Sequence, residues 1–257
     1  MVKAILRMLA LAGLILGWAF PLIAAEVSPS PGVGGTDRRV EVDVQQPPWS
    51  SLVRVQTELG GRCTGFLVSP QVVVTAAHCL FLSRVRRFVQ PGSVHVLLAY
   101  RRGQFAAHAR VTQFTIPPAY RPLDETGTAG ADRAVLVLER RLLPESQCLP
   151  VAPVPVLLPA PVRLGGYGQD RDEIAVADPQ CRLLGETPDG QGRPLLVHGC
   201  EATRGTSGAP LLWRDPDGRW TAIGIQIEAA TGGAGGRAVP LVAPADPAIR
   251  LDSSAGR

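Results

Sequence analysis

A histidine, an aspartate and a serine stand in sequence settings that could activate a hydroxyl group. His78 lies in residues 75–79 (Thr-Ala-Ala-His-Cys), and Ser207 lies in the glycine-rich residues 204–208 (Arg-Gly-Thr-Ser-Gly). Asp132 lies between them, just before an apolar run. A serine hydroxyl becomes a strong nucleophile when a base takes its proton and a third group orients that base. We therefore predict that Ser207 is a nucleophile, His78 its general base and Asp132 the residue that orients the base.

Each of these residues also has a simpler interpretation. His78 could be a structural histidine beside a cysteine, and residues 204–208 could be an ordinary loop. Asp132 could be a solvated residue at the start of a strand, with Asp124 as an alternative in a polar stretch. The occurrence of both motifs in one chain favours the catalytic interpretation.

The glycines around Ser207 indicate how the site would hold a developing negative charge. Glycine tolerates a positive φ, so residues 205–208 can form a tight turn. In such a turn the amides of Gly205 and Ser207 can point at one position, which is the geometry of an oxyanion hole. We therefore predict that these two amides bind the oxyanion.

The order of the three residues separates the known kinds of serine hydrolase. An α/β-hydrolase has its histidine after the serine, but no histidine follows Ser207, and residues 205–208 do not form a Gly-x-Ser-x-Gly elbow. The subtilisin order would require Asp37 or Asp43, both in a polar N-terminal stretch. The observed order, histidine then aspartate then serine, is that of chymotrypsin-like enzymes.

Short runs rich in valine, isoleucine and leucine alternate with turn residues along most of the chain, which is typical of strands and tight turns. The first set of expected strands comprises residues 51–57, 64–68, 71–75, 93–99, 109–114 and 134–139. The second set comprises residues 162–164, 181–184, 195–198, 210–213, 220–227 and 238–241. A proline-rich stretch, residues 145–161, separates the two sets. Many short strands in two halves predict an all-β fold of two small barrels.

Three segments resemble one family of enzymes. Residues 63–68 (Cys-Thr-Gly-Phe-Leu-Val) and 75–79 match its histidine segment, and residues 166–168 (Gly-Tyr-Gly) are similar to its Gly-Trp-Gly turn. From roughly Pro48 to Leu241 the chain resembles a secreted bacterial trypsin/chymotrypsin-like serine peptidase, near the glutamyl-endopeptidase branch. The resemblance implies two six-stranded Greek-key β-barrels (chymotrypsin-like) with the active site between them. It also implies an endopeptidase that forms an acyl-enzyme on protein or peptide substrates without a cofactor. The alternative is a catalytically silent binding or envelope protein on the same fold.

The chain has five cysteines, so at least one stays unpaired within it. The resemblance implies a disulfide between Cys63 and Cys79, and we predict a second one between Cys181 and Cys200, which bracket the approach to the serine motif. Cys148 is then left over, either as a small buried hydrophobe or in an intermolecular bond. None of the spacings resembles a Cys-x-x-Cys metal site, so we expect no bound metal.

The N-terminus has the pattern of an export signal. Lys3 and Arg7 precede an apolar run that ends in an Ala-Ala pair before Glu26. An uncleaved membrane anchor is the alternative, and only then do we expect contact with a membrane. We therefore expect a secreted or periplasmic protein.

The expected boundaries follow the changes in composition. Residues 27–36 are rich in Ser, Pro and Gly, which predicts a flexible start to the mature chain. We expect a signal peptide (1–25), a linker or propeptide (26–47), a peptidase domain (48–245, with barrels at about 48–145 and 160–245) and a loose tail (246–257).

Charge and composition exclude one class of partner. The net charge is +4, the arginines are spread along the chain, and aromatic residues make up only 5% of it. This pattern does not support binding to nucleic acid. We expect a monomer.

Three residues complicate the family pattern. Thr206 stands where the mammalian branch has an aspartate that pairs with a newly cut N-terminus, so we do not expect activation by that ion pair. By position, Glu201 could lie near the base of the specificity pocket and favour Arg or Lys before the scissile bond. The alternative is a rim or solvated glutamate, because an unpaired buried carboxylate is costly. Gln226 falls where glutamyl-specific relatives have a histidine, which argues against a strict preference for acidic residues.

Overall fold

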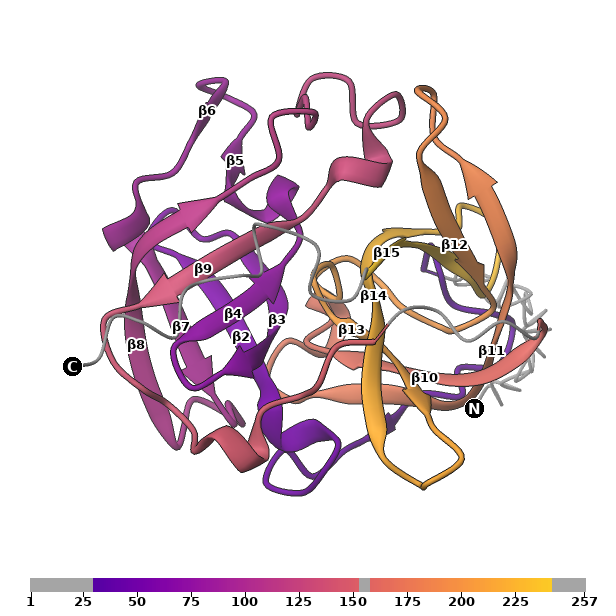
Figure 1. Cartoon of the computed structure of the whole chain (residues 1–257), viewed down its shortest axis with the longest axis horizontal. Helices are drawn as coiled ribbons and strands as arrows, with labels where there is room; N and C mark the ends of the chain where they lie inside the picture. Colours follow the sequence, from indigo (N-terminus) through magenta and orange to yellow (C-terminus); the bar gives the residue numbers. More distant parts are fainter. Residues whose placement is uncertain (1–29, 153–157, 242–257) are drawn as a thin grey trace, which may run out of the picture.

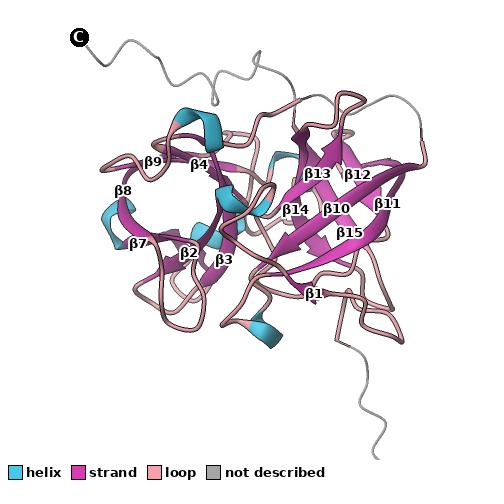
Figure 2. Cartoon of the chain, turned by 90° about the horizontal axis from the view of Figure 1, so that it is seen from below, coloured by secondary structure: helices cyan, strands magenta, loops and turns pink. Residues whose placement is uncertain are grey.

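The computed structural model describes residues 30–152 and 158–241. The expected signal peptide (1–25) and tail (246–257) lie outside the described residues. Two β-barrels lie next to each other, the first on the left and the second on the right of Figure 1, and Figure 2 shows the same pair from below. Among the described residues, no helix has the length and apolar character needed to cross a membrane.

The helices of the described part are short 3-10 turns of three or four residues. They are η1 (Trp49–Ser51), η2 (Ala77–Leu80), η3 (Pro91–Ser93), η4 (Ala129–Ala131), η5 (Glu145–Gln147) and η6 (Gln169–Arg171).

The first barrel closes through six antiparallel strands in the order β2-β3-β4-β9-β8-β7. They are β2 (Leu52–Thr57), β3 (Arg62–Ser69), β4 (Val72–Thr75), β7 (Val94–Leu98), β8 (Ala107–Thr115) and β9 (Ala134–Leu138). Every second residue of β7 is an apolar core residue, namely Val94, Val96 and Leu98. This alternation is what a strand with one face toward a core requires. A separate hairpin, β5 (Phe81–Leu82) and β6 (Arg87–Phe88), lies outside the barrel sheet.

The second barrel closes in the order β11-β10-β13-β14-β15-β12, because β12 pairs with both β15 and β11. Its strands are β10 (Ala160–Gly166), β11 (Val176–Pro188), β12 (Pro194–His198), β13 (Pro210–Arg214), β14 (Trp220–Ala229) and β15 (Gly236–Pro240). The turn from β13 to β14 has the sequence Asp-Pro-Asp-Gly (residues 215–218), with Gly218 at φ +85°. The prediction of two six-stranded chymotrypsin-like barrels is confirmed, and each expected strand has its counterpart.

The N-terminal stretch packs against the second barrel. Its Ser, Pro and Gly content predicts flexibility, but in the structure Val33 and Val44 are buried, and β1 (Val40–Glu41) pairs with β11. Gly32 has a φ of +84°, and a Cβ on it would lie 1.9 Å from the carbonyl oxygen of Ala202. The glycines of this stretch therefore permit a close backbone approach rather than a loose chain.

Thr64, in β3 of the first barrel, connects the two barrels through hydrogen bonds. Its hydroxyl donates to the carbonyl of Gly205 at 2.9 Å and accepts from the amide of Tyr167 at 2.8 Å. Its own amide donates to the carbonyl of Ser207 at 2.9 Å. Because Thr64 is fully buried, these bonds are shielded from water and fix the serine loop against the first barrel.

Candidate active site

His78 and Asp132 are brought together by two neighbouring strands of the first barrel. β4 pairs with β9 so that Thr75 lies opposite Ala134. His78 follows the end of β4 in η2, and Asp132 precedes the start of β9 after η4. The sequence therefore places both side chains at the same end of this strand pair.

One carboxylate holds the histidine at two points. The Nδ1 atom of His78 lies 2.6 Å from Oδ2 of Asp132, and the His78 backbone amide donates to Oδ1 at 2.9 Å. Asp132 is buried with a side-chain exposure of 8%, whereas the His78 side chain keeps 27%. With Nδ1 engaged by the carboxylate, Nε2 is the ring nitrogen left for a proton transfer. Asp124, the alternative aspartate, is exposed and accepts a bond from the Gly127 amide instead.

The electrostatic surroundings raise the pKa of His78. Burial disfavours the charged imidazolium, but the charge of Asp132 and its hydrogen bond outweigh that effect, and Glu125 adds to it. Net stabilisation of the imidazolium is what a general base requires at the moment it accepts a proton.

Ser207 lies in a turn packed against the first barrel. Gly208 has a φ of +85°, and a Cβ there would lie 2.1 Å from the carbonyl oxygen of Thr64. The Ser207 carbonyl lies 3.9 Å from Sγ of Cys79, the residue after His78. In the described part of the chain, no hydrogen bond joins the Ser207 hydroxyl to His78. The two segments therefore meet through the Thr64 and Cys79 contacts with the Ser207 backbone.

In the turn formed by residues 205–208, the serine turn, two amides have no hydrogen-bond partner among the described residues. Thr206, Gly208 and Ala209 donate their amides to carbonyls of the protein at 2.7–3.1 Å. Within the described residues, the amides of Gly205 and Ser207 make no such bond, and Gly205 has the positive φ of +93° that the sequence suggested. Unpaired amides flanking a candidate nucleophile are suited to binding an oxyanion.

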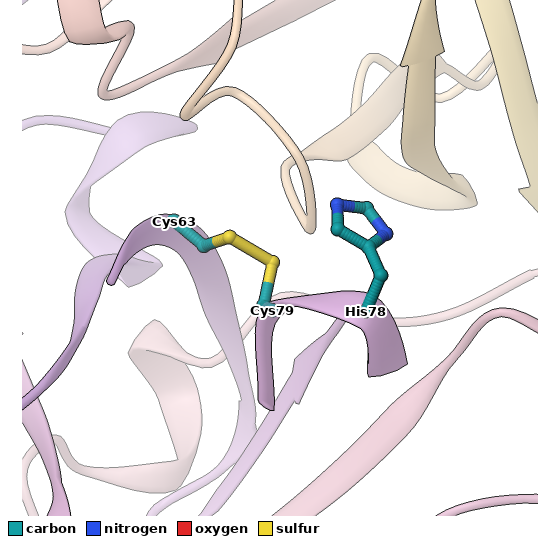
Figure 3. Close-up of side chains that lie close together, drawn as sticks. All are labelled: Cys63, His78 and Cys79. Carbon is teal, nitrogen blue, oxygen red and sulfur yellow. A yellow bond between two sulfur atoms is a disulfide. The ribbon is translucent and has the colours of Figure 1, made fainter. Parts of the chain in front are cut away.

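The structure contains both predicted disulfides, Cys63–Cys79 and Cys181–Cys200, and Cys148 is a free cysteine. Figure 3 shows the first disulfide beside the ring of His78, with Cys79 and His78 on the same short helix. Donor atoms of these three residues lie within 4.8 Å of one another, but the two sulfurs are joined to each other. The group therefore anchors the histidine helix and is not a metal site. Burial raises the pKa of the Cys148 thiol to about 11, which makes it a poor nucleophile.

Glu201 lies in an arrangement that the sequence did not suggest. Its side chain is fully buried, and its two carboxylate oxygens accept bonds from the amides of Gly34 at 3.0 Å and Arg38 at 2.6 Å. The Arg38 guanidinium lies 3.5 Å away. Glu201 is thus neither a solvated rim residue nor an open carboxylate.

Gln226 is buried beside a histidine that sequence reasoning missed. Its Oε1 lies 2.6 Å from Nε2 of His198, and its amide nitrogen donates to the carbonyl of Glu228. Nδ1 of His198 accepts from the Cys200 amide, so the proton sits on Nε2. Burial lowers the pKa of His198 to about 4, and the imidazole is neutral near pH 7. No local motif marks His198, because its partner lies on another strand.

A small hollow opens beside the His78–Asp132 pair. Its volume is about 170 Å³, and besides the pair it is lined by Ile227, Ala129 and the side chains of Glu125, Thr126 and Glu228. A mixed apolar and polar hollow next to a base can accommodate part of a bound chain.

Both the sequence and the fold of the chain are similar to those of known proteins. The sequence matches the trypsin family over residues 37–244. The fold is similar to that of a solved structure of a Glu endopeptidase in complex with MPD, with a TM-score of 0.70 and 20% sequence identity. The match covers 84% of this chain and 97% of the other. At 20% identity, the structural similarity shows the fold alone. Because the family match spans most of the chain, the protein belongs to the trypsin family of serine peptidases.

Proposed function

We propose that the protein is a secreted serine endopeptidase that uses His78, Asp132 and Ser207 as its catalytic residues. The observation that carries the proposal is the bond between Nδ1 of His78 and the buried Asp132 carboxylate, because it leaves Nε2 as the base. The two free amides of the serine turn supply the complementary charge stabilisation.

In the proposed reaction, the Ser207 hydroxyl oxygen attacks the carbonyl carbon of the scissile bond, and its proton passes to Nε2 of His78. The amides of Gly205 and Ser207 hold the tetrahedral oxyanion. His78 then gives the proton to the departing amine, and an acyl-enzyme forms on Ser207. Water deacylates the enzyme by the same route, with His78 again acting first as base and then as acid.

Reaction with a fluorophosphonate probe tests this mechanism. We expect the mature protein to be labelled between pH 6 and 9, and Ser207→Ala to abolish the labelling. Ser93→Ala is the matched control, because the Ser93 hydroxyl is bonded to the carbonyl of Gln90 in the first barrel. A folded wild-type protein that takes no label would favour the catalytically silent binding protein.

Secretion is supported by the N-terminal sequence and by the two disulfides, which form in oxidising compartments. We expect a new N-terminus at or near Glu26 in the exported protein. N-terminal sequencing checks this, and an intact Met1 on a membrane-associated protein would support the anchor instead.

The specificity proposal rests on Glu201 and Gln226. Glu201 is occupied by internal partners, and Gln226 with His198 forms a neutral pair. We therefore propose that the enzyme has no strict preference for an acidic residue immediately before the scissile bond. In this it would differ from the protein of similar fold whose name is Glu endopeptidase. Cleavage of a peptide library checks this, and dominant cleavage after Glu would contradict it.

A further inference from the structure

A segment far from the serine in sequence holds the loop that leads to it. We define the strap as Gly32–Arg39 and the pre-serine loop as Glu201–Thr203. The Ala202 amide donates to the carbonyl of Gly32 at 3.0 Å, and Glu201 accepts from two strap amides, as described above. The strap and the pre-serine loop are therefore joined by one bond between their backbones and by bonds from strap amides to the Glu201 carboxylate.

Charge strengthens this connection. Arg38 of the strap lies 2.7 Å from Asp178 as well as 3.5 Å from Glu201, and both carboxylates have side-chain exposures of 0%. The Glu201 amide in turn donates to Asp178 at 3.0 Å. Buried charges without partners are costly, and removing one partner of such a group is strongly unfavourable. Arg38 is the cation within reach of both buried carboxylates in the described structure.

A second group of charged residues, which we call the clamp (Arg39, Asp37 and Asp170), holds the other end of the pre-serine loop. Arg39 of the strap is buried and bonds to Asp170 at 2.5 Å, and the Thr203 hydroxyl donates to the same carboxylate at 2.7 Å. The Arg39 hydrogen bond lowers the pKa of Asp37. For Asp170, burial opposes ionisation, but bonds from Arg39 and Thr203 outweigh it and lower the pKa. The clamp is therefore ionised near neutral pH.

Hydrogen bonds connect the pre-serine loop to the turn that forms the proposed oxyanion hole. The Thr206 amide donates to the carbonyl of Thr203 at 3.1 Å, and the Arg204 carbonyl accepts from the Gln169 amide at 2.6 Å. These bonds fix the turn that carries the Gly205 and Ser207 amides. Thr206 itself carries no charge, and the strap contributes the positive charges of Arg38 and Arg39 to the carboxylates of Glu201, Asp178 and Asp170.

We propose that the strap is the internal positioning device of the oxyanion hole, with Arg38 and Glu201 as positioning residues. The proposal rests on the proposed peptidase function. In this arrangement Glu201 does not bind substrate; it is the anchor through which the strap sets the geometry of the Gly205 and Ser207 amides. The strap is then an integral part of the active enzyme rather than a released propeptide.

The first test removes the positive charge of Arg38, the strap residue that pairs with Glu201. We expect Arg38→Ala and Arg38→Gln each to lower kcat by about 10- to 1,000-fold, because losing one oxyanion donor costs about 10²–10³ in rate, with KM changed less than about threefold. Arg38→Lys keeps the charge and should recover part of kcat. Inhibition by a peptide boronate, which fills the oxyanion position, should weaken in parallel with kcat/KM.

The second test changes the strap backbone and has a matched control. Gly32→Ala should lower kcat in the same way, because its Cβ would collide with the Ala202 carbonyl. Gly92→Ala is the control, because Gly92 lies in η3 outside the strap and a Cβ there meets nothing within 4 Å. Its kcat should stay within about twofold of wild type. Circular dichroism confirms which variants are folded before the kinetics are compared.

The outcomes separate the two proposals. A wild-type protein that neither reacts with a fluorophosphonate nor cleaves peptides would refute the proposed function. A wild-type protein that is active, together with folded Arg38→Gln and Gly32→Ala variants of unchanged kcat, would overturn the strap proposal alone. A fall in kcat that Gly92→Ala, outside the strap, reproduces would also overturn it.

Discussion

The hydrogen bonds of His78 predict that replacing its aspartate by an amide lowers activity. Asp132 accepts from both the ring and the backbone of His78. An asparagine could present its NH₂ group to Nδ1, which would leave the proton on Nε2, where the serine needs an acceptor. We expect Asp132→Asn to lower kcat by about 10⁴-fold with little change in folding, a loss of the size known for this change in a serine-histidine-aspartate site.

Asp124→Asn is the control for this prediction, because Asp124 is exposed and bonds only within its own turn. Its kcat should remain within about twofold of wild type. Steady-state kinetics with a peptide substrate measures both variants, and a comparable loss in Asp124→Asn would reverse the assignment of the aspartate.

Glu125 should influence the pH dependence of the base. Asp132 and Glu125 raise the pKa of His78, and a general base works only in its neutral form. Activity is therefore lost as the pH falls through the His78 pKa. Glu125→Gln removes one source of the upward shift, so the acid limb of kcat/KM should move to lower pH.

The displacement should shrink in high salt, because Glu125 is exposed and its charge is screened. Glu186→Gln is the control, because Glu186 is an exposed carboxylate in the second barrel, whereas Glu125 lies in the first. It should leave the pH profile of kcat/KM unchanged. A shift to higher pH in Glu125→Gln would contradict the electrostatic assignment.

At the scale of elements, the two disulfides close loops of similar size. Cys63 and Cys79 are 16 residues apart, and the bond holds η2, which carries His78, to β3. We expect the double variant Cys63→Ser/Cys79→Ser to lose about 3 kcal/mol of unfolding free energy in the chain-entropy account. Guanidinium unfolding measures it, and Cys148→Ser should stay within about 0.5 kcal/mol, as it breaks no disulfide. An unchanged midpoint in the double variant would refute the stabilising role.

The barrel strands were predictable from sequence because each contains enough residues to show a run bounded by turn signals. β7 is an example, with Val94, Val96 and Leu98 on one face. The strands β1, β5 and β6 escaped prediction because two residues cannot display a period. The strap was missed for another reason. Glycine predicts flexibility and close approach equally well, and only the position of the Ala202 carbonyl decides between them at Gly32.

The same limit applies to the site residues. His78 and Ser207 stand in local motifs, so the roles that we propose for them could be inferred from a few neighbours. The partner of Glu201 could not, because the Arg38 amide that it accepts from is 163 residues away along the chain. The His198–Gln226 pair likewise joins two strands and leaves no local pattern.

At the scale of the whole molecule, the two barrels contribute different parts of the proposed site. The first carries His78 and Asp132, and the second carries the serine turn with its free amides. Chain order could predict this division. It could not predict that one buried threonine of β3, Thr64, would hold the parts together.

Thr64→Val tests whether this connection between the barrels sets the oxyanion geometry. The change keeps the shape but leaves the Gly205 carbonyl and the Tyr167 amide without their partner. At about 1–3 kcal/mol for each of the two buried unsatisfied groups, we expect a loss of about 2–6 kcal/mol in unfolding free energy. We also expect kcat to fall at least about tenfold, because a misplaced oxyanion donor contributes less in the transition state.

Thr57→Val is the matched control, since the Thr57 hydroxyl is also buried but accepts from the Gly61 amide within the first barrel. Because Gly61 is exposed and water can satisfy its amide, that variant should lose only about 0.5–1.5 kcal/mol of stability while the folded enzyme keeps its kcat. Urea unfolding and steady-state kinetics on the same preparations separate the two effects. If both variants lose stability and both keep kcat, the contact between the barrels stabilises the fold without positioning the catalytic groups. A loss of kcat confined to Thr64→Val would show that the serine turn takes its geometry from the opposite barrel.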